Sequence, residues 1–131
     1  MIEVYIDGAS AGDPGPSGAG IFIKGHGKAE QYSIPLGMMS NHEAEYHALI
    51  KALQLCVENN YRVVSFRTDS QAVDRSMEKQ FAKDDRYSSL VEEALRLADK
   101  LDLFFIKWIP SKQNNVADRL ARAAIKLNEG V

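Results

Sequence analysis

The sequence predicts an α/β protein in which one mixed sheet carries helices on both faces. The main observation is the order of its segments: three strand-like segments, then a helix, a strand, two helices, a strand and a helix. Strands joined by a tight turn pair antiparallel, and strands joined through a helix pair parallel by a right-handed crossover. The second observation is size: 131 residues, 45% hydrophobic and 26% charged, are ordinary for one globular domain. We therefore expect a single domain over residues 1–131.

Three strands are expected in the first part of the chain. Residues 2–6 alternate around β-branched and aromatic side chains, which is typical of a strand. A stretch rich in Gly and Pro, residues 8–18, follows and is predicted to be a loop. Residues 19–24 and 29–36 are strand-like on either side of Gly25-His26-Gly27, a hairpin signal. The three strands should form an antiparallel meander.

Hydrophobic spacing predicts the remaining elements. In the first helix the apolar residues recur at i, i+3, i+4 and i+7, from Leu49 to Cys56. The last strand is a short apolar run ended by Pro110, so we expect it to be buried with Trp108 in the core. We expect Cys56 to be buried as well. The predicted helices cover residues 43–58, 70–80, 87–101 and 116–128, and the strands cover residues 62–68 and 103–109.

Charge and cysteine content exclude several classes of protein. Sixteen Lys and Arg against eighteen Asp and Glu give a net charge of −2, so binding of nucleic acid through bulk positive charge is not expected. The only cysteine, Cys56, allows no internal disulfide. No apolar run is long enough for a membrane span, and the N-terminus lacks a signal peptide pattern. We expect a monomeric cytoplasmic protein without membrane contact, with His26 and His47 on its surface.

Four acidic residues occupy positions that simple solvation does not explain. Asp7 and Asp69 follow predicted strands, where open α/β sheets place their ligand sites. Glu45 is in line with the apolar stripe of the first helix, whereas Glu43 points the opposite way. Asp118 lies in the first turn of the last helix and shares its inner face. If the first and fourth strands are parallel neighbours, these acids gather in one cleft.

A cluster of like charges in one cleft requires a compensating cation. Carboxylate oxygens favour hard cations such as Mg²⁺ or Mn²⁺ over zinc. Two such ions can hold the attacking and leaving oxygens of a phosphodiester displacement. Each acid also has a structural interpretation, because helix dipoles favour acids in first turns and Asp often follows strands. Spacing alone leaves both interpretations open.

At these acids the sequence resembles the ribonuclease H type 1 family over nearly its whole length. Four signatures match in order: the first strand with its glycine-rich loop, a first helix with an acid in its first turns, a strand followed by an acid, and a closing strand, loop and helix. They lie at residues 5–20, 40–49, 68–70 and 108–121. Each is weak alone, and together they select the same four acids as the spacing.

The resemblance implies a five-stranded mixed sheet of order 3-2-1-4-5 and an enzyme that cuts the RNA strand of RNA/DNA hybrids with two metal ions. It implies that Asp7, Glu45, Asp69 and Asp118 are catalytic and bind Mg²⁺, or Mn²⁺ in its place. It also implies that Glu45 lies beside the 2′-hydroxyl of the RNA. The substrate-binding residues expected from it are Gly8, Ser10, Ser40, Asn41, Ser70 and Lys112.

Several positions depart from the family pattern. Asp13 replaces the usual Asn, and Asn41 is followed by His42 where the family shows a second Asn. The loop at residues 111–115 has no His, and only Lys112 could supply its positive charge. Residues 71–86 contain four acids and four bases where other members carry a basic protrusion. We therefore expect weak hybrid binding with a shallow salt dependence.

Two other functions compete with hybrid cleavage. The departures above are compatible with a catalytically weak or inactive ribonuclease H-like module that binds nucleic acid or a protein, although four intact acids argue against lost activity. An ATPase half-domain of the actin type shares the topology and an Asp-Gly turn after its first strand. It needs a second such domain to close over the nucleotide, and 131 residues cannot supply one.

Overall fold

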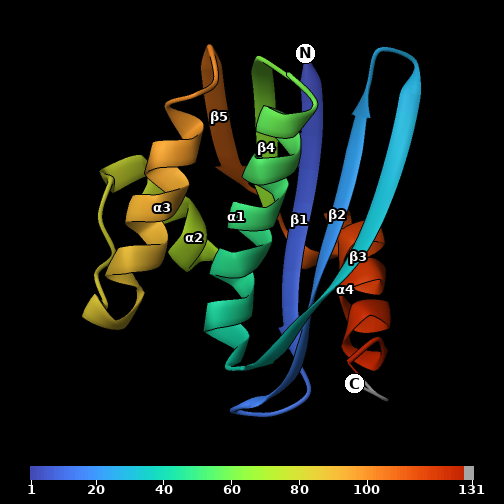
Figure 1. Cartoon of the computed structure of the whole chain (residues 1–131), viewed down its shortest axis with the longest axis vertical. Helices are drawn as coiled ribbons and strands as arrows, with labels where there is room; N and C mark the ends of the chain where they lie inside the picture. Colours follow the sequence, from blue (N-terminus) through green and yellow to red (C-terminus); the bar gives the residue numbers. More distant parts are fainter. Residues whose placement is uncertain (129–131) are drawn as a thin grey trace.

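The computed structural model describes residues 1–128 and contains one five-stranded sheet of order β3-β2-β1-β4-β5 (Figure 1). Strands β1 (Ile2–Ser10), β2 (Gly15–Gly25) and β3 (Lys28–Met39) form an antiparallel meander. Strand β4 (Val63–Thr68) pairs parallel with β1, and β5 (Leu103–Trp108) pairs parallel with β4. The predicted fold class and strand order are confirmed.

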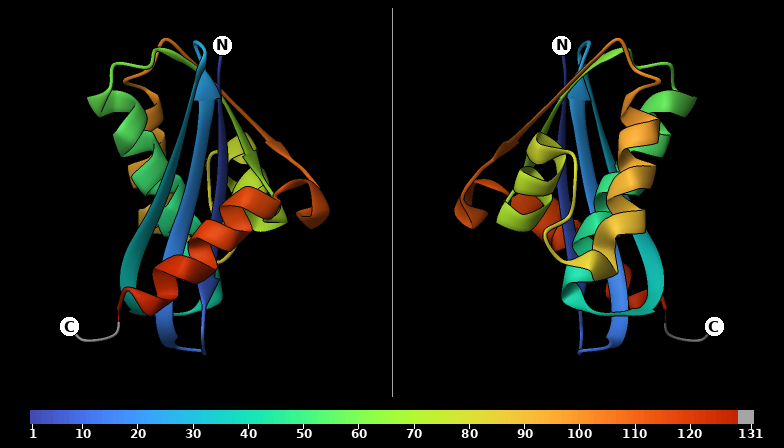
Figure 2. Two further views of the ribbon diagram at one scale, coloured as in Figure 1. Left: turned by 90° about the vertical axis from the view of Figure 1, so that its right-hand side faces the viewer. Right: turned by 90° about the vertical axis from the view of Figure 1, so that its left-hand side faces the viewer.

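Four α-helices lie on the two faces of this sheet (Figure 2). Helices α1 (Asn41–Glu58), α2 (Gln71–Lys79) and α3 (Ser88–Ala98) lie on one side, and α4 (Asn115–Lys126) crosses the other side over β1, β2 and β3. Two 3₁₀ turns precede α3 and α4: η1 (Asp85–Tyr87) and η2 (Ser111–Gln113). None of the helices in residues 1–128 combines the length and apolar character that a membrane crossing requires.

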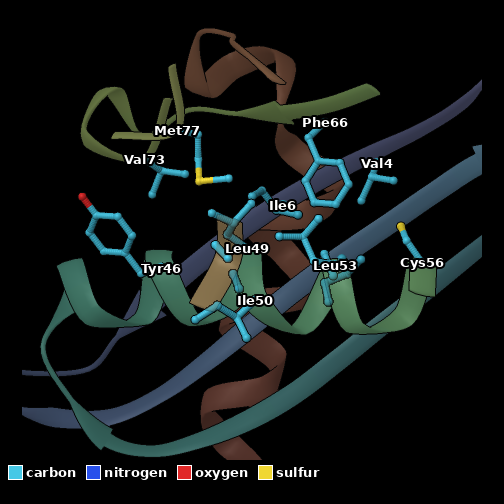
Figure 3. Close-up of a cluster of buried hydrophobic side chains, with 14 of the residues drawn as sticks. Val4, Ile6, Tyr46, Leu49, Ile50, Leu53, Cys56, Phe66, Val73 and Met77 are labelled. Atoms are coloured by element: carbon cyan, nitrogen blue, oxygen red, sulfur yellow. The ribbon is translucent and has the colours of Figure 1, made fainter. Parts of the chain in front are cut away.

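The main core lies between the sheet and α1 (Figure 3). Alternate residues of β1 and β4 point toward α1, which presents its predicted apolar stripe to them. Leu49, Leu53 and Cys56 are fully buried there, as is Phe66 of β4. The prediction of a buried Cys56 is confirmed, and α1 is thereby fixed in rotation about its axis.

The glycine-rich segment is not the long loop that its composition predicts. Strands β1 and β2 extend into residues 8–18, and only residues 11–14 lie outside them. The glycines serve close packing: a Cβ atom on Gly20 would lie 2.0 Å from the Ala117 carbonyl oxygen, and one on Gly18 would lie 2.5 Å from the Ala121 carbonyl. Because glycine has no side chain, α4 can rest directly on the strand.

The expectation of a buried last strand is wrong. Only Phe104 and Ile106 of β5 pack against the core, and the side chain of Trp108 is 42% exposed. The reason is that β5 is an edge strand and α4 covers only β1 to β3, so no helix of residues 1–128 covers the second face of β5. An apolar run alone does not distinguish a strand buried on both faces from one buried on a single face.

Candidate active site

Two carboxylates come from neighbouring parallel strands and lie at the same end of these strands. Asp7 lies in β1, and Asp69 directly follows the last residue of β4. The two strands are in register, with Ile6 opposite Thr68, so the acids that follow these residues are neighbours. The sheet topology therefore brings together two residues that are 62 positions apart in the sequence.

The third carboxylate, Glu45, comes from the first turns of α1. The helix begins with a capping box in which Ser40 accepts from the Glu43 N–H at 3.2 Å and Glu43 accepts from the Ser40 N–H at 3.2 Å. Glu45 instead faces the sheet edge, where the Asn41 amide donates to its Oε1 at 2.8 Å. The cap thus uses Glu43 and leaves Glu45 for the cleft, as the helical spacing predicts.

A glycine lets the start of α1 approach β1 closely. A Cβ atom on Gly8 would lie 2.2 Å from the backbone carbonyl oxygen of Ala44. No side chain fits in this contact without moving the backbone. Gly8 therefore brings Glu45 within range of Asp7, in addition to exposing its own backbone to the cleft.

The fourth carboxylate, Asp118, is held by a buried asparagine that the sequence analysis did not select. Asn114 is 1% exposed, and its Nδ2 donates to the Ile6 carbonyl at 2.9 Å. Its own carbonyl accepts from the Asp118 N–H at 3.0 Å. Asn114 thus connects the start of α4 to the residue before Asp7. Asn directly before a helix is a frequent cap, but the Asn114 side chain makes no cap hydrogen bond, so the sequence contains no signal for its bond to Ile6.

The four carboxylates line one cleft of about 460 Å³. Of the residues predicted for the site, Asp7, Gly8, Asn41, Glu45, Asp69, Lys112 and Asp118 line it, together with Ala9, Ser111 and Asn115. Arg122 forms an ion pair with Asp118 from the next turn of α4. The convergence is a property of the fold, because the acids come from four separate elements.

The three predicted serines lie around the cleft rather than in its lining. The Ser10 hydroxyl donates to the Gly12 and Met39 carbonyls, at 2.6 and 2.9 Å. Ser40 caps α1, and Ser70 caps α2 by accepting from the Val73 N–H at 3.2 Å. Their side chains therefore hold the surrounding loops and helices in place.

The cleft holds more acidic than basic side chains, since Lys112 is the one cation in its lining and Arg122 pairs with Asp118 beside it. The pKa of Asp7 is raised from 3.8 to about 8. The largest cause is burial, followed by the charges of Asp69 and Asp118, a hydrogen bond with Asp118 and the charge of Glu45. Burial also raises the pKa of Glu45, and a hydrogen bond from Ser70 opposes this shift. Asp7 therefore favours the protonated form at neutral pH unless a cation enters the cleft.

The donor set fits hard divalent cations, although the cleft is not closed around one. Its ligands would be carboxylate oxygens, which are the donors that Mg²⁺ and Mn²⁺ prefer. Among residues 1–128, no three acidic, histidine or cysteine side chains are grouped tightly enough to hold a metal ion as they stand.

Comparison with known proteins identifies the family. Residues 6–124 match the family described as Reverse transcriptase-like. The chain is 30% identical to ribonuclease HI of Synechocystis, over 97% of this chain and 89% of that protein. The chain belongs to the ribonuclease H type 1 family. This ribonuclease H is also 39% identical to EbsB of Enterococcus faecalis, over 96% and 95% of the two chains, and that protein's name assigns it to the hydrolases without a substrate.

A solved ribonuclease H structure supports the same assignment. The structure of LC11-RNase H1 in complex with an RNA/DNA hybrid superposes with a TM-score of 0.87 at 28% identity, covering 98% of this chain and 99% of that one. The predicted family and enzyme class, a ribonuclease H, are confirmed. The family generally uses divalent metal ions, which agrees with the oxygen donors of the cleft.

Replacing Asn114 by Ala should lower both stability and cleavage. The buried Ile6 carbonyl would lose its donor, at a cost of about 2 kcal/mol in the free energy of unfolding. Because α4 would lose its link to β1, we expect kcat for hybrid cleavage to fall more than KM changes. The measurements are urea denaturation and steady-state kinetics.

Asn128→Ala is the matched control for this variant. Asn128 lies at the opposite end of α4, and its Nδ2 donates to the Ser17 carbonyl at 2.7 Å. This variant should lose some stability and keep wild-type kcat. Equal losses of kcat in both variants would contradict a specific positioning role for Asn114.

Proposed function

We propose that this ribonuclease H cleaves the RNA strand of RNA/DNA hybrids at the four-carboxylate cleft. The observation that carries the proposal is the convergence of Asp7, Glu45, Asp69 and Asp118 in one cleft that Gly8 and Ala9 also line. An acidic cleft repels phosphate groups, so it is suited to nucleic acid only when cations enter with the substrate. The relative bound to a hybrid has the same fold.

In this proposal the carboxylates hold Mg²⁺, or Mn²⁺ in its place, in a two-metal arrangement. Bound there, the ions would activate the attacking water and stabilise the leaving 3′ oxygen. Asp7 contributes its carboxylate after losing the proton that its surroundings favour. Lys112, which lines the same cleft, supplies a positive charge toward substrate phosphate.

Discrimination of RNA from DNA is assigned to the start of α1. Asn41 donates to Glu45, which orients the carboxylate toward the cleft. A 2′-hydroxyl can donate to that carboxylate and accept from a backbone N–H, which deoxyribose cannot do. Gly8 and Ala9 present backbone groups at the same position.

A second groove beside the cleft supports hybrid binding. It measures about 660 Å³, and His42, next to the cleft residue Asn41, is one of its lining residues. Its cations are Arg75, Lys79, Lys83 and Arg86, and Phe81 is 58% exposed at its border. Asp84 is the one acid in its lining, and Arg86 pairs with it.

This groove changes the interpretation of the charge balance in residues 71–86. Helix α2 turns Arg75 and Lys79 toward the groove, while Asp74 and Glu78 lie outside its lining. Residues 71–86 therefore form a positive surface at the groove although their net charge is zero. We assign the groove to the DNA strand of the hybrid, whose phosphates it would contact.

The double variant Arg75→Ala/Lys79→Ala should weaken hybrid binding. If both side chains neutralise phosphates, the slope of log K against log salt should fall by about 1.8, at roughly 0.9 per contact. Fluorescence anisotropy with a labelled hybrid, on a cleavage-deficient background, gives the slope. Arg96→Ala/Lys100→Ala, at the last turn of α3 and just after the helix, makes the same charge change outside the groove and should leave the slope unaltered. An equal fall in both would mean that the groove does not hold the hybrid.

Gel analysis of cleavage tests the proposed function directly. The full chain is incubated with a labelled RNA/DNA hybrid, an RNA duplex or a DNA duplex, first with Mg²⁺ and then with Mn²⁺. We expect cuts in the RNA of the hybrid alone, and none with EDTA. Tight hybrid binding without cleavage in either metal would instead support a binding module built on the ribonuclease H fold.

A further inference from the structure

Within residues 1–128, one part of the sheet has no cover on the side of α4. Figure 2 shows α4 crossing only part of this side, with β4 and β5 beyond it. On β1, β2, β4 and β5, the residues that alternate with the core residues point to this uncovered side. We name it the open sheet face, and its members are Glu3, Tyr5, Phe22, Lys24, Val63, Ser65, Arg67, Leu103, Phe105 and Lys107.

The open sheet face alternates aromatic rings with cations. The Tyr5 and Phe22 rings lie 5.9 Å apart. Lys24 lies over both, with its Nζ at 5.3 Å from the Tyr5 centroid and 5.8 Å from the Phe22 centroid. Arg67 lies over Tyr5 at 5.6 Å, and Phe105 is 48% exposed farther along the sheet.

Positive charge predominates on this face. Lys24, Arg67 and Lys107 outnumber its one acid, Glu3, which lies 4.0 Å from the Lys24 Nζ and 3.1 Å from the Arg67 guanidinium. The protein as a whole is negative, with a net charge of −2. The fold therefore concentrates cations here against the overall balance, so a polyanion is the complementary partner.

The open sheet face is continuous with the catalytic cleft. A cavity of about 230 Å³ lies between it and the start of α4, bordered by Tyr5, Phe22 and Lys24. Lys112 and Asn115 line both this cavity and the carboxylate cleft. Through these two shared residues the cleft adjoins the cavity that the Tyr5 and Phe22 rings border.

We infer that the open sheet face binds a single-stranded extension of the nucleic acid, with bases against Tyr5, Phe22 and Phe105 and phosphates against Lys24 and Lys107. Unpaired bases expose the ring faces that stack on aromatic side chains, and cations beside the rings follow the backbone. A duplex hides those faces, so the site distinguishes single strands from paired ones. This inference rests on the proposed function only for the route from the cleft.

The test uses the intact wild-type chain and a single-stranded DNA oligonucleotide, which can be measured without any cleavage step. We expect binding by fluorescence anisotropy, and a fall of about 1.4 in the slope of log K against log salt in Lys24→Ala/Lys107→Ala, at roughly 0.7 per contact. Lys28→Ala/Lys100→Ala removes two exposed lysines elsewhere and should bind like wild type. Phe105→Ala should weaken binding at least about 5-fold while keeping the melting temperature, since its ring is half exposed.

A second measurement separates this site from the cleft. On an Asp7→Asn background, a hybrid with a single-stranded overhang should bind more tightly than a blunt hybrid, and Lys24→Ala/Lys107→Ala should abolish the difference. Equal affinity for both hybrids, or no binding of the oligonucleotide, would overturn the inference whatever the outcome of the cleavage assay. Self-association that Phe105→Ala abolishes, without oligonucleotide binding, would assign the face to a second copy of the chain. Failed cleavage with retained oligonucleotide binding would reject only the proposed function.

Discussion

Replacing Asp7 by Asn should reduce hybrid cleavage by at least about 10²-fold, the loss typical of removing one preorganised charge-stabilising group. The metal-free fold should stay as stable as wild type or become more stable. Asp7 lies among Asp69, Asp118 and Glu45, so an uncharged amide of the same shape relieves repulsion. Single-turnover cleavage and thermal denaturation in EDTA provide the two measurements.

Glu43→Gln is the matched control, because this acid lies two residues from Glu45 and belongs to the cap of α1 rather than to the cleft. It should keep cleavage and lose about 1 kcal/mol of stability at most. Wild-type activity in Asp7→Asn would rule out a role for Asp7 in the reaction. A marked fall in its melting temperature would show that the carboxylate supports the fold.

The stability of the metal-free protein should depend on pH through the same residue. The pKa of Asp7 is raised from 3.8 to about 8 in the folded state, so its contribution to stability is fully present below about pH 4. That contribution is lost progressively as pH rises from about 4 to about 8, because the unfolded chain releases this proton in that range and the folded protein keeps it. Asp7→Asn lacks this loss, so its advantage over wild type should grow between pH 4 and pH 8. Urea denaturation in EDTA across this range measures it, and a constant difference would contradict the pKa shift.

Divalent metal should reverse the order of stability of wild type and Asp7→Asn. A cation that binds only the folded state stabilises it in proportion to its affinity, and wild type has the complete set of carboxylates. With saturating Mg²⁺ the melting temperature of wild type should therefore rise more than that of Asp7→Asn. This comparison reports metal binding without any cleavage step.

Much of the cleft could be predicted because periodicity and topology determine it. Glu45 and Glu43 are close in sequence, and the helical repeat alone assigns Glu45 to the inner face. The proximity of Asp7 and Asp69 follows from the parallel pairing of β1 with β4, although β1 continues past Asp7 to Ser10 instead of ending there. These rules depend on local backbone geometry, which a single sequence contains.

Features that depend on packing between distant segments could not be predicted. The role of Asn114 requires knowing that its side chain reaches the Ile6 carbonyl, 108 positions earlier in the sequence. The exposure of Trp108 requires knowing how far α4 extends across the sheet. The positive groove could not be predicted because it depends on which side of α2 faces the groove. The charges of residues 71–86 sum to zero when that orientation is unknown.

The most disruptive single methyl group should be the one added by Gly20→Ala. Its Cβ would lie 2.0 Å from the Ala117 carbonyl oxygen and 2.5 Å from the Ala121 backbone nitrogen, both fixed parts of α4. The helix must move away from β2, so the free energy of unfolding should fall by about 2 to 3 kcal/mol. Because Asp118 lies between these two residues in the sequence of α4, cleavage should fall with stability. Denaturation and cleavage below the melting temperature of the variant measure both effects.

Gly27→Ala separates this steric effect from the ordinary cost of replacing glycine. Gly27 lies at the tip of the β2–β3 hairpin with φ +73°, and an added Cβ meets no atom of residues 1–128 within 4 Å. It should cost about 1 kcal/mol through backbone strain and leave cleavage unchanged. If Gly20→Ala costs no more than Gly27→Ala, α4 does not rest on β2 as closely as the structure places it. If Gly20→Ala is unstable but cleaves normally once folded, Asp118 does not depend on that contact for its position in the cleft.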